Sequence, residues 1–211
     1  MEVPLRADAE RNRQRLLISA KELFAERGVD VTLDEIARHA GVGTGTAYRR
    51  FPNKDALIEA LMADRIGELA AIAEECLEDP DPWRGLAGYF ERALALQASD
   101  RGLKDVLFSP GRGRDRVAHA RRSLAPIVTR LVRRAVDAGV VRGDIATSDV
   151  PVINFMLNTV VDFGRDVEPE LYRRYLTIVL DGLRPREDPT PLPVEALKIP
   201  AFQEALARWK P

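Results

Sequence analysis

The sequence predicts an all-α protein. Apolar residues recur at helical spacing through nearly the whole chain, and no segment shows sustained apolar and polar alternation bounded by hairpin turns. The length of 211 residues suits one domain, or a small module fused to a mid-sized one. We therefore expect helices packed around a substantial apolar core.

The first helix is predicted to be about 20 residues long with one buried face. Its apolar positions follow an i, i+1, i+4, i+7, i+8 pattern, at Leu16, Leu17, Ala20, Leu23 and Phe24. Gly28 ends this helix. The second helix opens at Thr32, because Thr32 and Glu35 have the spacing of a capping box, and it ends at Gly41.

A third short helix is predicted from Thr44 to Phe51, where Pro52 stops it. Asn53 then caps a long fourth helix. Apolar residues repeat every three or four positions along this helix, at Ile58, Met62, Ile66, Leu69, Ala73 and Cys76. Cys76 is therefore interpreted as a small core residue rather than a redox sensor.

A break in helical structure is predicted at Asp79–Pro82, where two prolines interrupt the helical pattern. Beyond this break, an amphipathic helix is predicted at 83–97, followed by a short helix at 101–108 and a loop at 109–113. Three longer helices are predicted at 115–138, with a kink at Pro126, at 147–164 and at 169–182. A proline-rich tail begins at Pro185 and contains a short helix at 202–209.

Composition and charge exclude several classes of protein. Hydrophobic residues make up 45% of the chain and the net charge is −1, so bulk charge gives no indication of a nucleic-acid or membrane partner. The longest uncharged stretch, Val150–Val161, is shorter than the about 20 residues of a membrane-spanning helix. The N-terminus lacks the pattern of a signal peptide. We therefore expect a cytoplasmic protein with no membrane partner.

Metal and catalytic chemistry is not expected. Cys76 is the single cysteine and the only histidines are His39 and His119, so an intrachain disulfide is excluded and a Cys/His zinc site has too few ligands. The sequence shows no Ser/His/Asp arrangement, no phosphate-binding glycine loop and no pair of carboxylates whose positions indicate catalysis. We expect no enzyme activity and no cofactor.

The segment from Leu33 to Phe51 has the residue pattern of a helix-turn-helix. Its inner face is formed by small and apolar residues, namely Ile36, Ala40, Val42, Ala47 and Phe51, and Gly41 lies in the turn. The exposed face of the second of these helices carries Thr44, Gly45, Thr46, Tyr48, Arg49 and Arg50. Small hydroxyls, a glycine, a phenol and two guanidinium groups suit contacts to phosphates and base edges in a DNA major groove.

Lys54 follows Pro52 at the start of the fourth helix, where its charge opposes the helix dipole. A phosphate nearby would explain it. The stretch Thr32–Leu57, TLDEIARHAGVGTGTAYRRFPNKDAL, resembles the signature of the TetR family of transcriptional regulators, and the string from Gly45 to Lys54 is similar to that family's G-T-x-Y-x-x-F-x-x-K. The strong resemblance covers roughly residues 10–65; beyond them only the helical plan is similar.

The resemblance implies a three-helix, helix-turn-helix DNA-binding head joined by a long helix to a helical ligand-binding and dimerisation body. It implies phosphate contacts from Thr32, Thr46, Tyr48 and Lys54, and base contacts from Thr44, Gly45 and Arg49. Two positions depart from the commonest pattern: Gly43 stands where Ser is frequent, and Arg50 where His is frequent. Gly43 weakens the cap of the recognition helix, and Arg50 adds charge to its exposed face.

A single short recognition helix reads one half-site, so specific binding to a double-stranded operator requires a homodimer. The last two long helices are the predicted interface, because the first is apolar over most of its circumference and the second has a wide apolar stripe. The interface residues are predicted to be Val152, Met156, Thr159, Val160, Tyr172, Tyr175, Leu176, Val179 and Leu183.

A mostly apolar cavity for a small-molecule effector is predicted between head and interface. Its walls are predicted to be Trp83, Phe90, Leu94, Gln97, Leu107, Phe108, Val128, Asn154, Phe155 and Asn158, with the three amides orienting the ligand. A filled core with satisfied amides is an equal alternative for each residue. Five arginines between Arg121 and Arg134 are interpreted as a solvated helix face rather than an anion site.

The predicted function is a ligand-responsive transcriptional regulator, a repressor released from a palindromic operator by a small apolar or amphipathic effector. The alternatives are an architectural DNA-binding protein of the same fold without an effector and, more remotely, an all-α enzyme. The predicted domains are a DNA-binding domain at 1–54, a ligand-binding and dimerisation domain at 55–184, and a proline-rich tail at 185–211.

Overall fold

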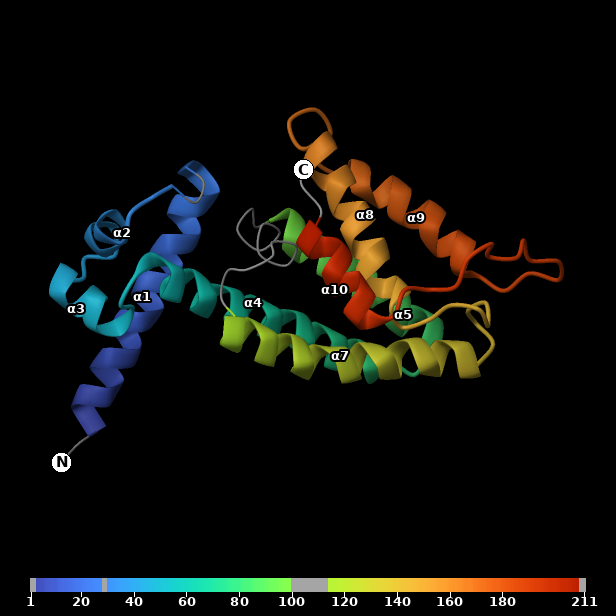
Figure 1. Cartoon of the computed structure of the whole chain (residues 1–211), viewed down its shortest axis with the longest axis horizontal. Coiled ribbons are helices and arrows are strands. Elements are labelled where there is room, and N and C mark those ends of the chain that lie inside the picture. Colours follow the sequence, from blue (N-terminus) through green and yellow to red (C-terminus); the bar gives the residue numbers. More distant parts are fainter. Residues whose placement is uncertain (1–2, 28–29, 100–113, 209–211) are drawn as a thin grey trace.

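The computed structural model describes residues 3–27, 30–99 and 114–208. Within these ranges every regular element is an α-helix, as the sequence predicts. Figure 1 shows the helices gathered into two parts, a smaller head and a larger body, with one long helix running from the first part through the second. The helical fold and the division into head and body agree with the prediction from the sequence.

The head consists of α1 (Val3–Arg27), α2 (Leu33–His39) and α3 (Thr44–Arg50) packed on the first half of α4 (Lys54–Leu77). The five apolar residues predicted for the first helix are all buried, and they join the inner face of the helix-turn-helix in one core. Gly41 has a φ of +60° in the turn between α2 and α3, a conformation that side chains other than glycine rarely adopt. The turn therefore depends on this glycine.

Capping fixes the start of α2 and of α4. The Thr32 hydroxyl accepts the N–H of Glu35, and the Glu35 carboxylate accepts the N–H of Thr32 at 2.8 Å, so the predicted capping box is present. The side-chain oxygen of Asn53 accepts the N–H of Ala56 at 2.8 Å and caps α4. The recognition helix α3 is different, because Gly43 precedes it and no side chain caps it.

The long helix α4 contributes to two apolar cores. Leu57, Ile58 and Ile66 lie in the head core, whereas Leu69, Ala73 and Cys76 lie in the body core. The two cores thus divide inside α4, between Ile66 and Leu69. The first three turns of this helix belong structurally to the head.

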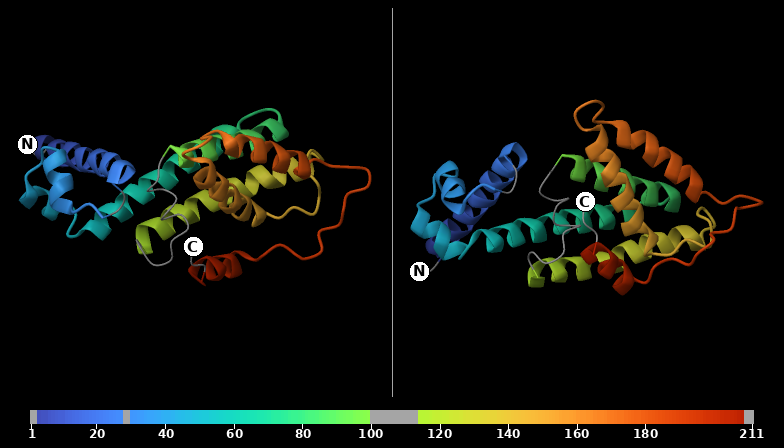
Figure 2. Two further views of the ribbon diagram at one scale, coloured as in Figure 1. Left: turned by 90° about the horizontal axis from the view of Figure 1, so that it is seen from above. Right: turned by 45° about the horizontal axis from the view of Figure 1, so that its top comes forward.

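The body packs α5 (Pro82–Ala98), α7 (Arg114–Asp137), α8 (Asp149–Gly164) and α9 (Leu171–Leu183) around the second half of α4. The two further views show α7 running alongside α4, with α8 and α9 as a neighbouring pair (Figure 2). Asp81 caps α5 by accepting the N–H groups of Trp83 and Arg84. The helix and loop predicted at residues 101–113 lie outside the described residues.

The proline-rich tail returns to the body. Residues 184–198 form no helix, and α10 (Ile199–Arg208) then lies across a cavity from residues of α7 and α8. Arg142 in the turn before α8 holds the beginning of the tail, because its guanidinium donates to the carbonyl of Thr190 at 2.7 Å and its N–H donates to the carbonyl of Leu183. The predicted short helix is present, beginning three residues earlier than expected.

Acid should weaken the capping box of α2. The hydrogen bonds that Glu35 accepts from the backbone and hydroxyl of Thr32, together with that from Arg27, lower its pKa from 4.5 to about 2. Because the folded state favours the charged carboxylate, Glu35 contributes stability above its ordinary pKa and loses that contribution as the pH falls through 4.5 towards 2.

We therefore expect Glu35→Gln to lower the free energy of unfolding at neutral pH, and the difference from wild type to shrink as the pH falls below 4.5. Urea titrations followed by circular dichroism over this pH range measure both quantities. Asp34→Asn, on the neighbouring exposed position, is the control for general loss of negative charge. A difference that stays constant down to low pH would contradict the assignment to the Glu35 carboxylate.

Candidate DNA-binding interface and ligand cavity

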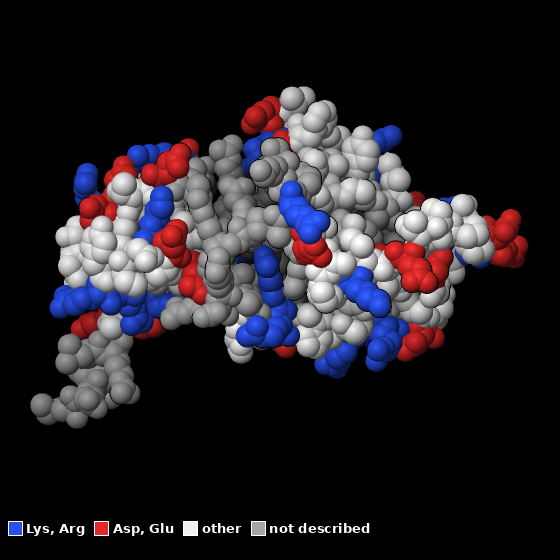
Figure 3. Space-filling model, in the orientation of Figure 1, with Lys and Arg blue, Asp and Glu red and all other residues white. Residues whose placement is uncertain are grey.

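The recognition helix α3 presents one open face to solvent. Ala47 packs the helix against the head, whereas Thr44, Gly45 and Tyr48 are exposed, with Tyr48 at 46%. A Cβ atom added at Gly45 would meet nothing within 4 Å, so a partner has room to approach the backbone there. Figure 3 shows Lys and Arg side chains gathered on the head near α3, the part of the molecule farthest from the body. This face suits a polyanion.

The two arginines of α3 have different partners. The guanidinium of Arg49 donates to the carbonyl of Gly45 at 3.2 Å and to the hydroxyl of Thr46 at 3.1 Å, so it lies along the exposed first turn of its own helix. Arg50 donates to the carboxylate of Glu10 on α1 at 3.0 Å. Arg49 is therefore placed where a groove contact is available, whereas Arg50 braces the recognition helix against α1.

The two flanking positions predicted to contact phosphate lie at helix starts. The Thr32 hydroxyl donates to the carboxylate of Glu35 at 2.8 Å, so this group already serves the cap of α2. Lys54 is the first residue of α4 and is half-buried. With Tyr48 and Thr46 on α3, the predicted contact residues lie on α3 and at the starts of the two helices on either side of it.

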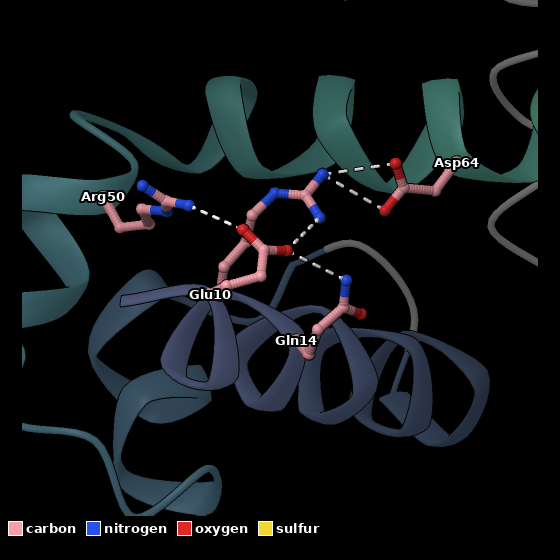
Figure 4. Close-up of polar contacts among 5 residues, drawn as sticks. Glu10, Gln14, Arg50 and Asp64 are labelled. Atoms are coloured by element: carbon pink, nitrogen blue, oxygen red, sulfur yellow. Dashed lines mark hydrogen bonds and ion pairs between the residues drawn. The ribbon is translucent and has the colours of Figure 1, made fainter. Parts of the chain in front are cut away.

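A network of charged groups centred on Glu10 connects α1, α3 and α4 (Figure 4). Glu10 accepts hydrogen bonds from Arg50 and Gln14, and from Arg13 at 3.4 Å. Arg13 also donates to both carboxylate oxygens of Asp64 on α4, each at 3.2 Å. The spacing of Glu10, Arg13 and Gln14 on one helix is visible in the sequence, whereas the contacts to Arg50 and Asp64 depend on tertiary packing.

The outer face of α8 and α9 is apolar and exposed. Of the predicted interface residues, Val152, Met156, Thr159 and Tyr175 are exposed, and Val160 and Val179 are half-buried. Tyr172, Leu176 and Leu183 instead point into the body core, because they lie on the side of α9 that packs against its own chain. Ile178, which belongs to the apolar stripe predicted for the second interface helix, is 56% exposed, and Phe163, which was not predicted, is 82% exposed.

A cavity of about 310 Å³ lies in the body. Three predicted residues, Gln97, Val128 and Asn154, line it. The other lining residues are Leu69, Tyr89, Arg121, Leu124, Ala125, Thr129, Thr147, Val150, Pro151, Ile199 and Phe202. The helices α4, α5, α7, α8 and α10 therefore all contribute to its wall.

The other predicted cavity residues lie elsewhere. Phe90 and Leu94 are 1% and 0% exposed, because α5 turns them into the body core. The Arg184 guanidinium lies 3.6 Å from the centre of the Trp83 ring, and Trp83, like Phe155 and Asn158, does not line the cavity. Leu107 and Phe108 lie outside the described residues.

Two features of the cavity wall were not predicted. Ile199 and Phe202 come from α10, and the pattern of the tail contains no signal for where it docks. Arg121, interpreted from the sequence as part of a solvated face, also lines the cavity, and burial lowers its pKa. Burial likewise raises the pKa of the Tyr89 hydroxyl, so this group stays neutral.

The fold and these surfaces define a helix-turn-helix DNA-binding protein with a helical regulatory body. Two family profiles match the chain: "Bacterial regulatory proteins, tetR family" at residues 16–61, and "Transcriptional regulator SbtR-like, C-terminal domain" at residues 81–185. The crystal structure of the TetR transcription regulatory protein from Mycobacterium vanbaalenii is 34% identical, covers 86% of this chain and 100% of its own, and superposes with a TM-score of 0.62. The chain belongs to the TetR family of transcriptional regulators.

Other relatives are similar over smaller parts or only in fold. The HTH-type transcriptional regulator SrpR of Pseudomonas putida is 47% identical over 60 residues, which are 28% of each chain. The match to this curated relative therefore spans about a quarter of its length. A regulator FadR from Bacillus subtilis, solved in complex with stearoyl-CoA, is 19% identical, covers 81% of this chain and 97% of its own, and has a TM-score of 0.66.

Family membership makes the protein a DNA-binding transcriptional regulator rather than an enzyme. In the ranges that the structure describes, no helix is long and apolar enough to cross a bilayer. Histidine, cysteine and acidic side chains in the same ranges form no cluster of three or more that suits a metal ion.

The ion pair between Arg13 and Asp64 should contribute little to stability. The Arg13 side chain is 18% exposed and that of Asp64 is 42% exposed, so water screens the pair partly. We expect a double-mutant cycle with Arg13→Ala and Asp64→Ala to give a coupling of about 0.2–1 kcal/mol in urea unfolding.

The same cycle on Arg173 and Glu170, an exposed pair at the start of α9, is the matched control and should give a smaller coupling. A coupling of several kcal/mol at Arg13 and Asp64 would show that the network, rather than apolar packing, holds the head on α4.

Proposed function

We propose that the protein is a repressor that binds a palindromic operator as a homodimer and leaves it when a small apolar or amphipathic molecule occupies the cavity. The observation that carries this proposal is the placement of α4, since Ile66 packs in the head core and Leu69, one turn later, lines the cavity. A molecule that shifts α4 would therefore shift the head.

DNA recognition rests on α3 and its neighbours. Arg49 is the candidate for base contact, together with Thr44 and Gly45 on the open first turn of α3. Tyr48, Thr46, Thr32 and Lys54 are proposed to contact phosphates. We assign Arg50 mainly to positioning, because Glu10 holds its guanidinium.

Dimerisation is proposed through the exposed apolar face of α8 and α9. Met156, Phe163 and Ile178 are large apolar side chains that are 47%, 82% and 56% exposed on this face. Large apolar side chains exposed together on neighbouring helices are typical of interaction sites. Pairing this face with a second copy would form a four-helix interface and place two heads side by side, which recognition of two half-sites requires.

The cavity favours a ligand-responsive regulator over an architectural protein of the same fold. Its volume lies at the lower end of the range of about 300–1,000 Å³ for ligand sites. The FadR protein of the same fold was solved in complex with stearoyl-CoA, so a protein with this fold can bind a molecule that carries an acyl chain. An effector needs a differential affinity for the two states, typically about 1–3 kcal/mol, to release the operator.

Contacts to DNA should separate into two kinds. We expect Tyr48→Phe and Lys54→Ala to weaken binding across all sequences, by about 1 kcal/mol each, because they remove phosphate contacts. Arg49→Ala should change the preferred sequence instead, since a bidentate contact to guanine discriminates by about 1–3 kcal/mol. Selection of binding sites from a random duplex library, followed by titrations at several salt concentrations, measures both effects.

Arg130→Ala is the matched control, because Arg130 is exposed on α7 in the body. An unchanged selected motif with Arg49→Ala would assign this arginine to the backbone. Binding that does not depend on salt, or full affinity for a single half-site, would overturn the proposed mode of DNA recognition.

The proposed interface predicts that a charge on its apolar face separates the subunits. Met156→Glu and Ile178→Glu should each convert the dimer to a monomer in analytical ultracentrifugation and abolish tight operator binding, because an unpaired charge would be buried between the copies. Val194→Glu in the tail is the control, since Val194 is 77% exposed and lies outside α8 and α9. A dimer that survives both substitutions would place the interface elsewhere.

A further inference from the structure

Three amide side chains are buried beside the cavity. Gln97, Asn154 and Asn158 are 3%, 8% and 1% exposed. Nδ2 of Asn158 donates to the backbone carbonyl of Asn154 at 2.8 Å and to the side-chain oxygen of Gln97. These contacts link α5 to α8 through polar groups inside an otherwise apolar core.

The acceptor atoms of this cluster are not fully used. The side-chain oxygen of Asn154 is buried and accepts no hydrogen bond from any described residue, and the same holds for the side-chain oxygen of Asn158. A buried acceptor without a donor destabilises the folded state, because it has lost its hydrogen bonds to water. Asn158 does not line the cavity, but Asn154 does. The broad side-chain torsion of an asparagine amide allows the Asn154 oxygen to meet a group in the cavity.

The rest of the wall near Asn154 is mainly apolar. Val128, Val150 and Pro151 line the cavity with it, and Ile199 and Phe202 of α10 lie on the wall as well. A bound molecule is therefore partly shielded from water, so its own polar groups must find partners in the protein.

From these observations we propose that the cavity binds a small neutral molecule with an apolar body and one hydrogen-bond donor, an O–H or N–H group, that bonds the side-chain oxygen of Asn154. This inference rests on the proposed function, because it names the chemical class of the effector. The apolar body contacts the valines and the α10 side chains, and the donor satisfies the buried acceptor.

A carboxylate is the competing chemistry, because Arg121 lines the same cavity. A carboxylate has no donor, however, and would leave the Asn154 oxygen unsatisfied. The affinity for a neutral donor-bearing molecule should therefore depend on Asn154, whereas the affinity for an acid of the same length should depend on Arg121.

The test uses the full chain and three probes of similar length: 1-nonanol, octyl methyl ether and nonanoate. The ether has as many heavy atoms as the alcohol but no donor. Isothermal titration calorimetry should give an affinity for 1-nonanol about tenfold higher than for the ether, which is the effect of satisfying one buried acceptor. Nonanoate should bind more weakly than the alcohol.

Asn154→Leu should bind alcohol and ether with equal affinity, because the acceptor is gone while the volume of the wall is similar. Val150→Ile is the matched control on the same helix; it adds one methylene group to the wall and should leave the ratio of alcohol to ether affinity at the wild-type value. Because the ratio is first measured on the wild-type protein, a variant that fails to fold does not remove the test.

Equal affinities of wild type for alcohol and ether, tightest binding of nonanoate, or no binding of any probe would each overturn this inference. Operator release, measured separately, tests the proposed function. Release by a molecule that lacks a donor would refute the inference and leave the repressor function standing. Donor-dependent binding with no change in operator affinity would support the binding chemistry and refute ligand-controlled repression.

Discussion

The participation of α4 in two apolar cores is the constraint on which the rest of the structure depends. This 24-residue helix begins at a cap in the head and ends in the middle of the body. Ile66 is 1% exposed in the first core and Leu69 is 3% exposed in the second. Interiors are packed too tightly to absorb small shifts, so a displacement of one half of the helix cannot be confined to that half.

Apolar packing couples the head to α4 more strongly than the ion pairs do, because its contribution to stability is larger. The Glu10 network is exposed to water and its ion pairs are each worth about 0.2–1 kcal/mol. Complete burial of one leucine or isoleucine is worth about 1.5–3 kcal/mol, and Leu57, Ile58 and Ile66 on α4 are all buried in the head. The network around Glu10 orients the recognition helix, and the apolar core determines where the head lies on α4.

The parts of the fold that depend on local interactions could be predicted from the sequence. The capping box at Thr32, the cap at Asn53 and the turn at Gly41 each involve residues only a few positions apart, so their spacing reveals them. The apolar stripe of α4 was also correct, since all six of its predicted residues are buried. Helical periodicity identifies which residues share a face.

Periodicity does not identify what that face packs against. For this reason several residues predicted for the dimer interface or the cavity lie in the body core instead. Tyr172 and Leu176 belong to the apolar stripe of α9, but the stripe faces the chain's own body, while Tyr175 and Ile178 lie on the outer side. Phe90 and Leu94 were expected at the cavity for the same reason, because buried and cavity-lining residues have the same pattern on α5. The return of α10 to the cavity depends on contacts distant in sequence, which no local pattern encodes.

Two places where this chain departs from rules of local stability coincide with the surfaces proposed for function. Gly43 leaves α3 without a side-chain cap, so this seven-residue helix depends on the packing of Ala47 and its neighbours. Asn154 and Asn158 place amide oxygens in an apolar core without donors among the described residues. Serine at the cap and leucine at the amides would satisfy the rules of stability better. A natural sequence departs from such rules mainly where function requires it, and here the departures lie on the face open to DNA and beside the cavity. The helix α4 connects these two places, because it packs in the core of the DNA-binding head and also lines the wall of the cavity.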